Sequence, residues 1–130
     1  MHRIFTALGI LVVCGCHSLS PNRIKADGRE EMHLALTERI PNGTALDEAR
    51  SKMEAAGFDC VLLADSFFTE APGFIDDESD YKSVANARML RCTRSESAGL
   101  LMAHIWAVAL VLDQNDKVED VLVLHRMEGP

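Results

Sequence analysis

The spacing of apolar residues changes near the middle of the chain. Between residues 27 and 57, apolar positions recur at every third or fourth residue, which places them on one face of a helix. Between residues 58 and 125 they gather in short runs separated by polar turns, a pattern typical of strands. The pattern therefore predicts helices first and strands afterwards.

Two helices are expected before residue 58. The first covers residues 27–39 with Asp27 as a candidate N-cap, and the second is the clearer because Thr44 can cap it and Gly57 can end it in a left-handed conformation. The apolar stripe of the first helix comprises Met32, Ala35, Leu36 and Ile40. That of the second comprises Leu46, Ala49, Met53 and Ala56.

Four strands are expected after the helices. They cover residues 58–64, 86–94, 101–112 and 118–125. Residues 65–83 form a long acidic loop between the first two strands, and loops of this length are usually functional or mobile. The expected fold is α+β, with two short helices packed on a three- to four-stranded antiparallel sheet in the order α-α-β-β-β-β.

The last two strands are expected to pair as a hairpin about Asn115 and Asp116. This register sets Asp113 opposite Val118 and Trp106 opposite His125, and it makes both faces apolar. One face carries Trp106, Val108, Leu110, Leu112, Val121 and Val123. The other carries Ile105, Ala107, Ala109, Val111, Leu122 and Leu124, and is a candidate interaction surface. The alternatives for this second face are cover by the first helix or simple exposure to solvent.

The N-terminal segment is separate from this pattern. His2 and Arg3 give a basic start, and residues 4–13 are uncharged and apolar, as in a secretory signal. A helix that spans a bilayer needs about 20 apolar residues, and this run is shorter. The segment is therefore expected to direct export.

The end of this segment, Val13-Cys14-Gly15-Cys16, resembles the lipobox of bacterial lipoproteins. The resemblance implies that residues 1–15 are removed as a signal peptide and that Cys16 carries the lipid. Residues 16–28 would then form a tether, and residues 29–130 a single domain facing the periplasm, anchored in the outer membrane. A plain secretory signal with incidental cysteines is the alternative.

The element order behind a lipobox resembles the SmpA/OmlA (BamE-like) group of small outer-membrane lipoproteins. Residues 41–49, Pro-Asn-Gly-Thr-Ala-Leu-Asp-Glu-Ala, are similar to that group's Gly-Met-Ser/Thr-x-x-Glu/Gln-Val helix start. Residues 118–121, Val-Glu-Asp-Val, are similar to its last strand. The group's usual Gly-x-Pro after the helix is replaced by Gly57-Phe58-Asp59-Cys60. The resemblance implies a role in outer-membrane assembly or maintenance.

Composition narrows the range of partners. The 130 residues suit one small domain, and a hydrophobic fraction of 48% is sufficient for a packed core. The net charge of −7 argues against nucleic acid, because phosphate contacts need clustered Lys and Arg. The expected partners are the membrane, through the lipid on Cys16, and either an envelope protein or a second copy of the chain as a homodimer.

Two further cysteines fall in consecutive expected strands. Cys60 and Cys92 can form a disulfide if their Cα atoms come within about 7 Å, since exported proteins meet an oxidising compartment. Two buried free thiols are the alternative.

No catalytic motif is recognisable, and no cofactor or metal site is expected. The acidic residues 76–80 lack an EF-hand ligand pattern, which favours a solvated loop near Arg88, Arg91 and Arg94 over a calcium site. His104 and His125 lie on adjacent expected strands and can approach each other. The sequence therefore predicts a non-enzymatic, membrane-tethered interaction domain. The alternative is a small-ligand or metal-ion carrier that uses the acidic loop or the two histidines.

Overall fold

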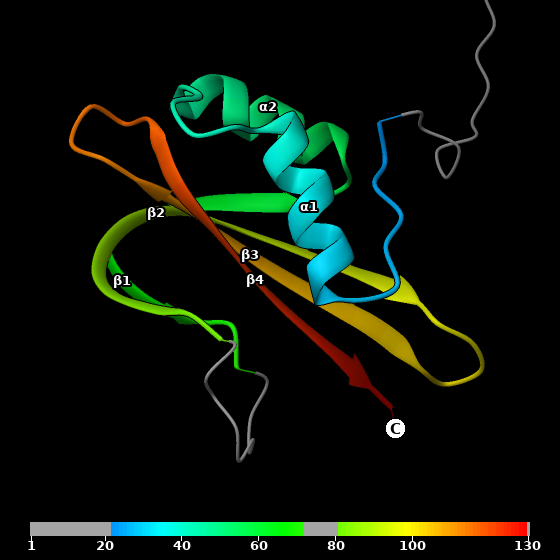
Figure 1. Cartoon of the computed structure of the whole chain (residues 1–130). Helices are drawn as coiled ribbons and strands as arrows, with labels where there is room; N and C mark the ends of the chain where they lie inside the picture. Colours follow the sequence, from blue (N-terminus) through cyan, green and yellow to red (C-terminus); the bar gives the residue numbers. More distant parts are fainter. Residues whose placement is uncertain (1–21, 72–80, 130) are drawn as a thin grey trace, which may run out of the picture.

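The computed structural model describes residues 22–71 and 81–129 of the chain. Two helices precede four strands, which confirms the expected α+β order (Figure 1). The helices are α1 (Arg29–Arg39) and α2 (Leu46–Ala55), and the strands are β1 (Asp59–Thr69), β2 (Ser83–Ser97), β3 (Ala103–Leu112) and β4 (Val118–Glu128). Cys16 and the acidic residues 76–80 lie outside the described residues.

The strands form one antiparallel sheet in which each strand pairs with the next along the chain, in the order β1-β2-β3-β4. Both helices lie on the same face of this sheet (Figure 1). The main core lies between the helices and the sheet. It includes Met32, Leu36, Met53, Leu90, Trp106, Val108, Leu110, Val121 and Val123. The apolar stripes predicted for the two helices supply their side of this core, because Met32, Leu36, Ile40, Ala49, Met53 and Ala56 are all buried.

The second face of the sheet has a cover that the sequence did not indicate. The register of β1 shifts between Leu63 and Ser66 and again before Phe68, and such bulges increase the local bend and twist. The sheet curls, as the strong curvature of β2 shows (Figure 1). Phe68 thereby joins a second buried cluster with Met89, Ala109 and Leu122.

This curl corrects the expectation of an exposed apolar surface. Of the six residues on the candidate interaction face, Ala107, Ala109, Val111 and Leu122 are buried within the chain itself. Ile105 and Leu124 are only half-buried. Neither a partner nor the first helix is needed to cover most of this face, because the far end of the β1–β2 hairpin covers it.

The bulges also explain why the predicted strand bounds were too short. The break in alternation after residue 64 favours a loop, but β1 continues past it to Thr69 and β2 begins at Ser83. Residues 65–69 and 83 of the expected loop 65–83 therefore belong to the strands of a long hairpin. At the other end, β3 begins at Ala103 rather than at residue 101, because residues 98–102 form the β2–β3 turn.

The structure confirms one predicted helix end, at Gly57, and contradicts the two predicted N-caps. Gly57 has a φ of +98° and follows α2, as predicted. The predicted caps are wrong. Gly28 and Ala45 occupy the two N-cap positions, and the Thr44 hydroxyl donates to the carbonyl of Pro41 at 2.6 Å. The N–H of Leu46 is instead satisfied by the carbonyl of Asp116, so tertiary contact replaces a local cap.

The register of the last hairpin is confirmed where it matters for the site. Trp106 is paired with His125, as the turn position predicted. A shift between Val111 and Leu112 changes the pairing near the turn, so Val118 lies opposite Leu112 and not opposite Asp113. The carboxylate of Asp113 accepts hydrogen bonds from the N–H groups of Asn115 and Lys117, which closes the turn.

Candidate functional site

The end of the sheet next to the β2–β3 turn gathers aromatic and ionisable side chains on the helix-facing side. The ring of Trp106 stacks on that of His125 with centroids 4.0 Å apart. Nδ1 of His104 and Nε2 of His125 are 2.8 Å apart, so the two rings share a hydrogen bond. Burial, and then the neighbouring His104, lower the pKa of His125. The two histidines therefore do meet, as the strand order suggested.

Glu96 connects this aromatic group to two arginines. Its carboxylate accepts a hydrogen bond from Trp106 Nε1 at 3.1 Å and pairs with Arg23 at 3.2 Å and Arg94 at 3.4 Å. Burial opposes the ionisation of Glu96, but the hydrogen bond from Trp106 and the two positive charges outweigh it and lower the pKa. The residue thus holds the N-terminal segment against β2.

Arg94 is a buried cation at the same place. Its guanidinium donates to the carbonyl of Ala56 at 2.9 Å and lies over the ring of Phe58, 4.9 Å from the centroid. Burial lowers its pKa. The φ of +98° at Gly57 favours glycine there, and a side chain at this position would also displace the guanidinium of Arg23, which lies 2.6 Å from where a Cβ would stand. These contacts fix the end of α2, the N-terminal segment and β2 to one another.

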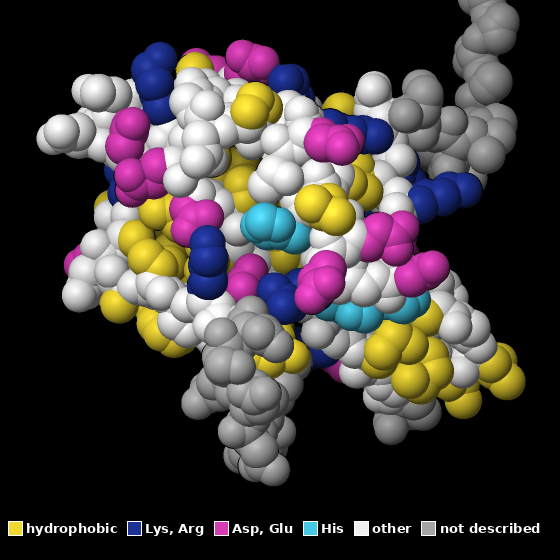
Figure 2. Space-filling model, in the orientation of Figure 1, with side chains coloured by type: hydrophobic (Ala, Val, Ile, Leu, Met, Phe, Trp, Pro, Cys, Tyr) yellow, Lys and Arg dark blue, Asp and Glu magenta, His cyan; other side chains and the backbone are white. Residues whose placement is uncertain are grey.

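The β2–β3 turn beyond this cluster and the adjacent end of β4 together expose four large apolar side chains, which we call the tip patch: Leu100, Leu101, Met102 and Met127. Leu100 is 89% exposed and Leu101 is 68% exposed. Figure 2 shows hydrophobic side chains gathered over this end of the molecule, beside histidine. Sequence analysis placed residues 101–102 in a strand and missed the patch, although Gly99 was a signal for a turn.

Cys60 and Cys92 are Cα partners in the β1–β2 ladder, and their Sγ atoms lie 2.6 Å apart. Cys92 is buried, and contact with Cys60 together with burial raises its pKa. The contact lowers the pKa of the half-exposed Cys60. The structure thus brings together the two thiols that the sequence proposed as a bridge. Whether they are oxidised stays a prediction.

Beside Cys60, on the face of the sheet opposite the helices, is a groove of about 440 Å³ that we call the edge groove. It is lined by Asp59, Cys60, Val61, Leu63, Arg91 and Thr93. Among the strands that the structure describes, β1 is an outer strand of the sheet and pairs with β2 alone. Val61 is 51% exposed and Phe67 is 58% exposed on this strand. The edge groove therefore combines an outer strand edge with the exposed side chain of Val61, and Phe67 is a second exposed apolar residue further along the same strand.

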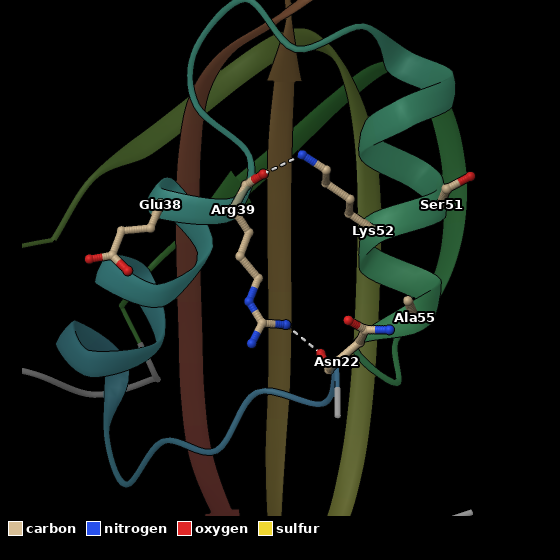
Figure 3. Close-up of a pocket in the computed structure, with 6 residues that line it drawn as sticks. All are labelled: Asn22, Glu38, Arg39, Ser51, Lys52 and Ala55. Carbon is tan, nitrogen blue, oxygen red and sulfur yellow. Dashed lines mark hydrogen bonds between the residues drawn. The ribbon is translucent and has the colours of Figure 1, made fainter. Parts of the chain in front are cut away.

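A second hollow, of about 420 Å³, lies between α1, α2 and the N-terminal segment (Figure 3). Lys52 Nζ donates to the carbonyl of Arg39 at 2.8 Å, and the guanidinium of Arg39 donates to the carbonyl of Asn22 (Figure 3). Lys52 also pairs with Glu48 one turn earlier on α2. These contacts fasten the two helices and the incoming chain together, which gives the hollow a structural role.

The arginines expected near the acidic loop all have contacts with described residues, whereas the acidic residues 76–80 lie outside the described part of the chain. Arg88 binds Asp116 at 2.7 Å, and that contact lowers the pKa of the Asp116 carboxyl. Arg91 lies 5.9 Å from the ring of Phe68. Within residues 22–71 and 81–129, no group of three His, Cys, Asp or Glu side chains is placed to hold a metal ion.

No protein-family model, curated protein or solved structure matches this chain.

Proposed function

We propose that the protein is a membrane-tethered envelope lipoprotein that acts without catalysis, as a protein-interaction domain. The observation that carries the proposal is the edge groove, where β1 offers an outer strand edge flanked by exposed Val61. Exposed apolar edge strands readily pair with a strand from another chain. A partner segment that adds to the edge gains backbone hydrogen bonds, and the side chains of the groove provide specificity.

The lipobox supports the tethered part of this proposal. A lipid on Cys16 would hold the domain at the membrane, where two or three acyl chains give durable anchoring. No helix among the described residues is long and apolar enough to span a bilayer. The resemblance to the SmpA/OmlA group supports a partner in outer-membrane assembly or maintenance.

The test is site-specific photocrosslinking of the full-length protein in intact cells. A photoreactive amino acid at position 61 should give a discrete adduct with an envelope protein, or with a second copy if the partner is a homodimer. The same amino acid at position 34 is the control, because Leu34 is an exposed apolar residue on α1 away from β1. Adding Phe67→Lys should weaken the adduct at position 61, and adding Leu34→Lys should not. Equal adducts at positions 61 and 34, or none at 61, would contradict the proposal.

The contact between His104 and His125 favours a second candidate function, transport of a transition-metal ion. The two imidazole nitrogens are 2.8 Å apart, close enough for both to contact one metal ion. Neutral imidazole is a common ligand of Zn²⁺. Calorimetric titration of the protein with Zn²⁺ is the test. Heat of binding that disappears in His104→Ala supports this candidate, and the absence of heat removes it.

A further inference from the structure

The tip patch leaves large apolar side chains open to solvent, from 38% exposed at Met102 to 89% at Leu100. Leu100 and Leu101 project from the turn, and Met102 and Met127 extend the apolar area along the start of β3 and the end of β4. Residues 97–105 contain no charged residue. Clustered, exposed apolar side chains on an otherwise charged surface mark a site of contact with a protein or a membrane.

The backbone at the tip is strained as well as apolar. Leu101 has a φ of +62°, a conformation that side-chain-bearing residues adopt at a cost in free energy. A glycine or asparagine would suit this position better, and burial does not compensate for the leucine, which is 68% exposed. A strained, exposed leucine is most readily explained by a contact outside the domain.

The route of the chain places this tip near the proposed lipid. Arg23 is bound to Glu96, which is the second-last residue of β2 and leads directly into the turn. In Figure 1 residues 22–28, in blue, run along the side of the molecule on which the β2–β3 turn lies. Seven residue steps separate Cys16 from Arg23, and an extended chain of that length spans at most about 25 Å. A lipid on Cys16 therefore keeps the tip patch within reach of the bilayer surface.

The charged side chains near the tip are paired with one another, so they add no strong electrostatic attraction to a lipid surface. Arg126 and Glu128 pair at 2.8 Å, and Glu96 is occupied by Arg23 and Arg94, so the neighbouring charges largely compensate one another. Side chains such as Leu and Met partition into the interfacial region by burial of apolar area, which needs no anionic lipid.

From these observations we propose that the tip patch inserts into the interfacial region of the membrane that carries the lipid on Cys16. The inference rests on the proposed lipid anchor and adds a second contact, which orients the domain. Because the two contacts are on one chain, the anchor raises the effective concentration of the tip at the surface, so weak insertion is sufficient. The tip patch and the edge groove share no residue, so the edge remains free for a protein partner.

The test uses the full-length lipidated protein in vesicles of phosphatidylcholine with brominated acyl chains, which quench tryptophan by contact. The native Trp106 is buried and gives a constant background. Leu100→Trp should be quenched at least about twofold more than Leu34→Trp, because interfacial insertion reaches the acyl boundary. Adding Leu101→Asn, which suits the positive φ, should reduce this quenching without lowering Tm. The matched change Leu34→Asn should leave it unchanged.

The outcomes separate the tip from the anchor. If the protein floats with the vesicles but Leu100→Trp is no more quenched than Leu34→Trp, the anchor stands and the tip proposal is wrong. If the emission of Leu100→Trp shifts to the blue without quenching, a protein surface covers the tip instead, and the proposal is also overturned. If the protein does not float, the anchor fails and the inference fails with it.

Discussion

The carboxylate of Glu70 accepts a hydrogen bond from the backbone N–H of Val123, 2.8 Å away in β4. Glu70 follows the end of β1 and is 3% exposed, and its other oxygen accepts from the N–H of Lys82 and pairs with Arg29 at 3.1 Å. A side chain thus holds the curled end of the β1–β2 hairpin against β4, at a place where the first and last strands do not pair directly. This clasp keeps Phe68 over the second face of the sheet.

Loss of this clasp is expected to destabilise the domain strongly. Glu70→Ala leaves the Val123 N–H buried without its acceptor and Arg29 without this carboxylate, and breaking a buried pair of this kind costs about 3–5 kcal/mol. Urea unfolding of the variant and of wild type measures the difference. Glu38→Ala on the exposed side of α1 is the control and should change the free energy of unfolding by less than about 0.5 kcal/mol. A Glu70→Ala variant as stable as this control would show that the clasp is unimportant.

The paired cysteines lead to a prediction about reactivity. In the mature protein isolated without reductant, Cys60 and Cys92 should both resist alkylation, because we expect the bridge to form after export. After reduction, Cys60 should react first, because its pKa is lowered and its side chain is half-exposed. Cys92 should react slowly, because its pKa is raised and it is buried.

Mass spectrometry of the alkylated protein measures both steps. Label on both cysteines before reduction would rule out the bridge. If the bridge is present, its removal should lower the free energy of unfolding by about 3–4 kcal/mol, because it closes a loop of roughly 30 residues. The control is alkylation after unfolding in denaturant with reductant, where the two thiols should react alike.

The histidine pair predicts how stability depends on pH. The pKa of His125 in the folded protein lies below its ordinary value of 6.5, so the folded state binds fewer protons than the unfolded state over the interval between the two. The contribution of this group is complete above about pH 6.5 and is lost as the pH falls toward the folded pKa. The free energy of unfolding should therefore be lower at pH 5.5 than at pH 7.5.

Urea titrations of wild type and His125→Gln at the two pH values test this prediction. The difference between the two pH values should shrink in His125→Gln, which cannot titrate. Glu96 and Asp116 have lowered pKa values, and their contributions are lost at more acidic pH. Greater stability of wild type at pH 5.5 than at pH 7.5 would contradict the assignment.

Local patterns were sufficient to predict the element order and one strand register. The pairing of Trp106 with His125 follows from the turn at residues 113–117, because turn position fixes register in a hairpin. The burial of Ala109 could not be predicted in the same way. It depends on bulges in β1 and on Phe68 and Glu70, which are distant in sequence from Ala109 and match no local motif.

The two exposed surfaces also could not be predicted from local sequence patterns. Val61 looked like an ordinary strand residue in the sequence, and its exposure depends on β1 being the outer strand of the sheet. Leu100 and Leu101 looked like the start of a strand, and only the turn conformation exposes them. Both surfaces depend on which parts of the chain remain uncovered, and that is a property of tertiary structure.

The lipid on Cys16 is the central claim of this account, since both the interaction domain and the membrane contact of the tip depend on it. The most direct measurement is metabolic labelling with palmitate in a Gram-negative bacterium, followed by membrane fractionation, for wild type, Cys14→Ser and Cys16→Ser. Label and membrane association should be present in wild type and in Cys14→Ser and absent in Cys16→Ser. Unlabelled wild type, or label that persists in Cys16→Ser, would contradict the account.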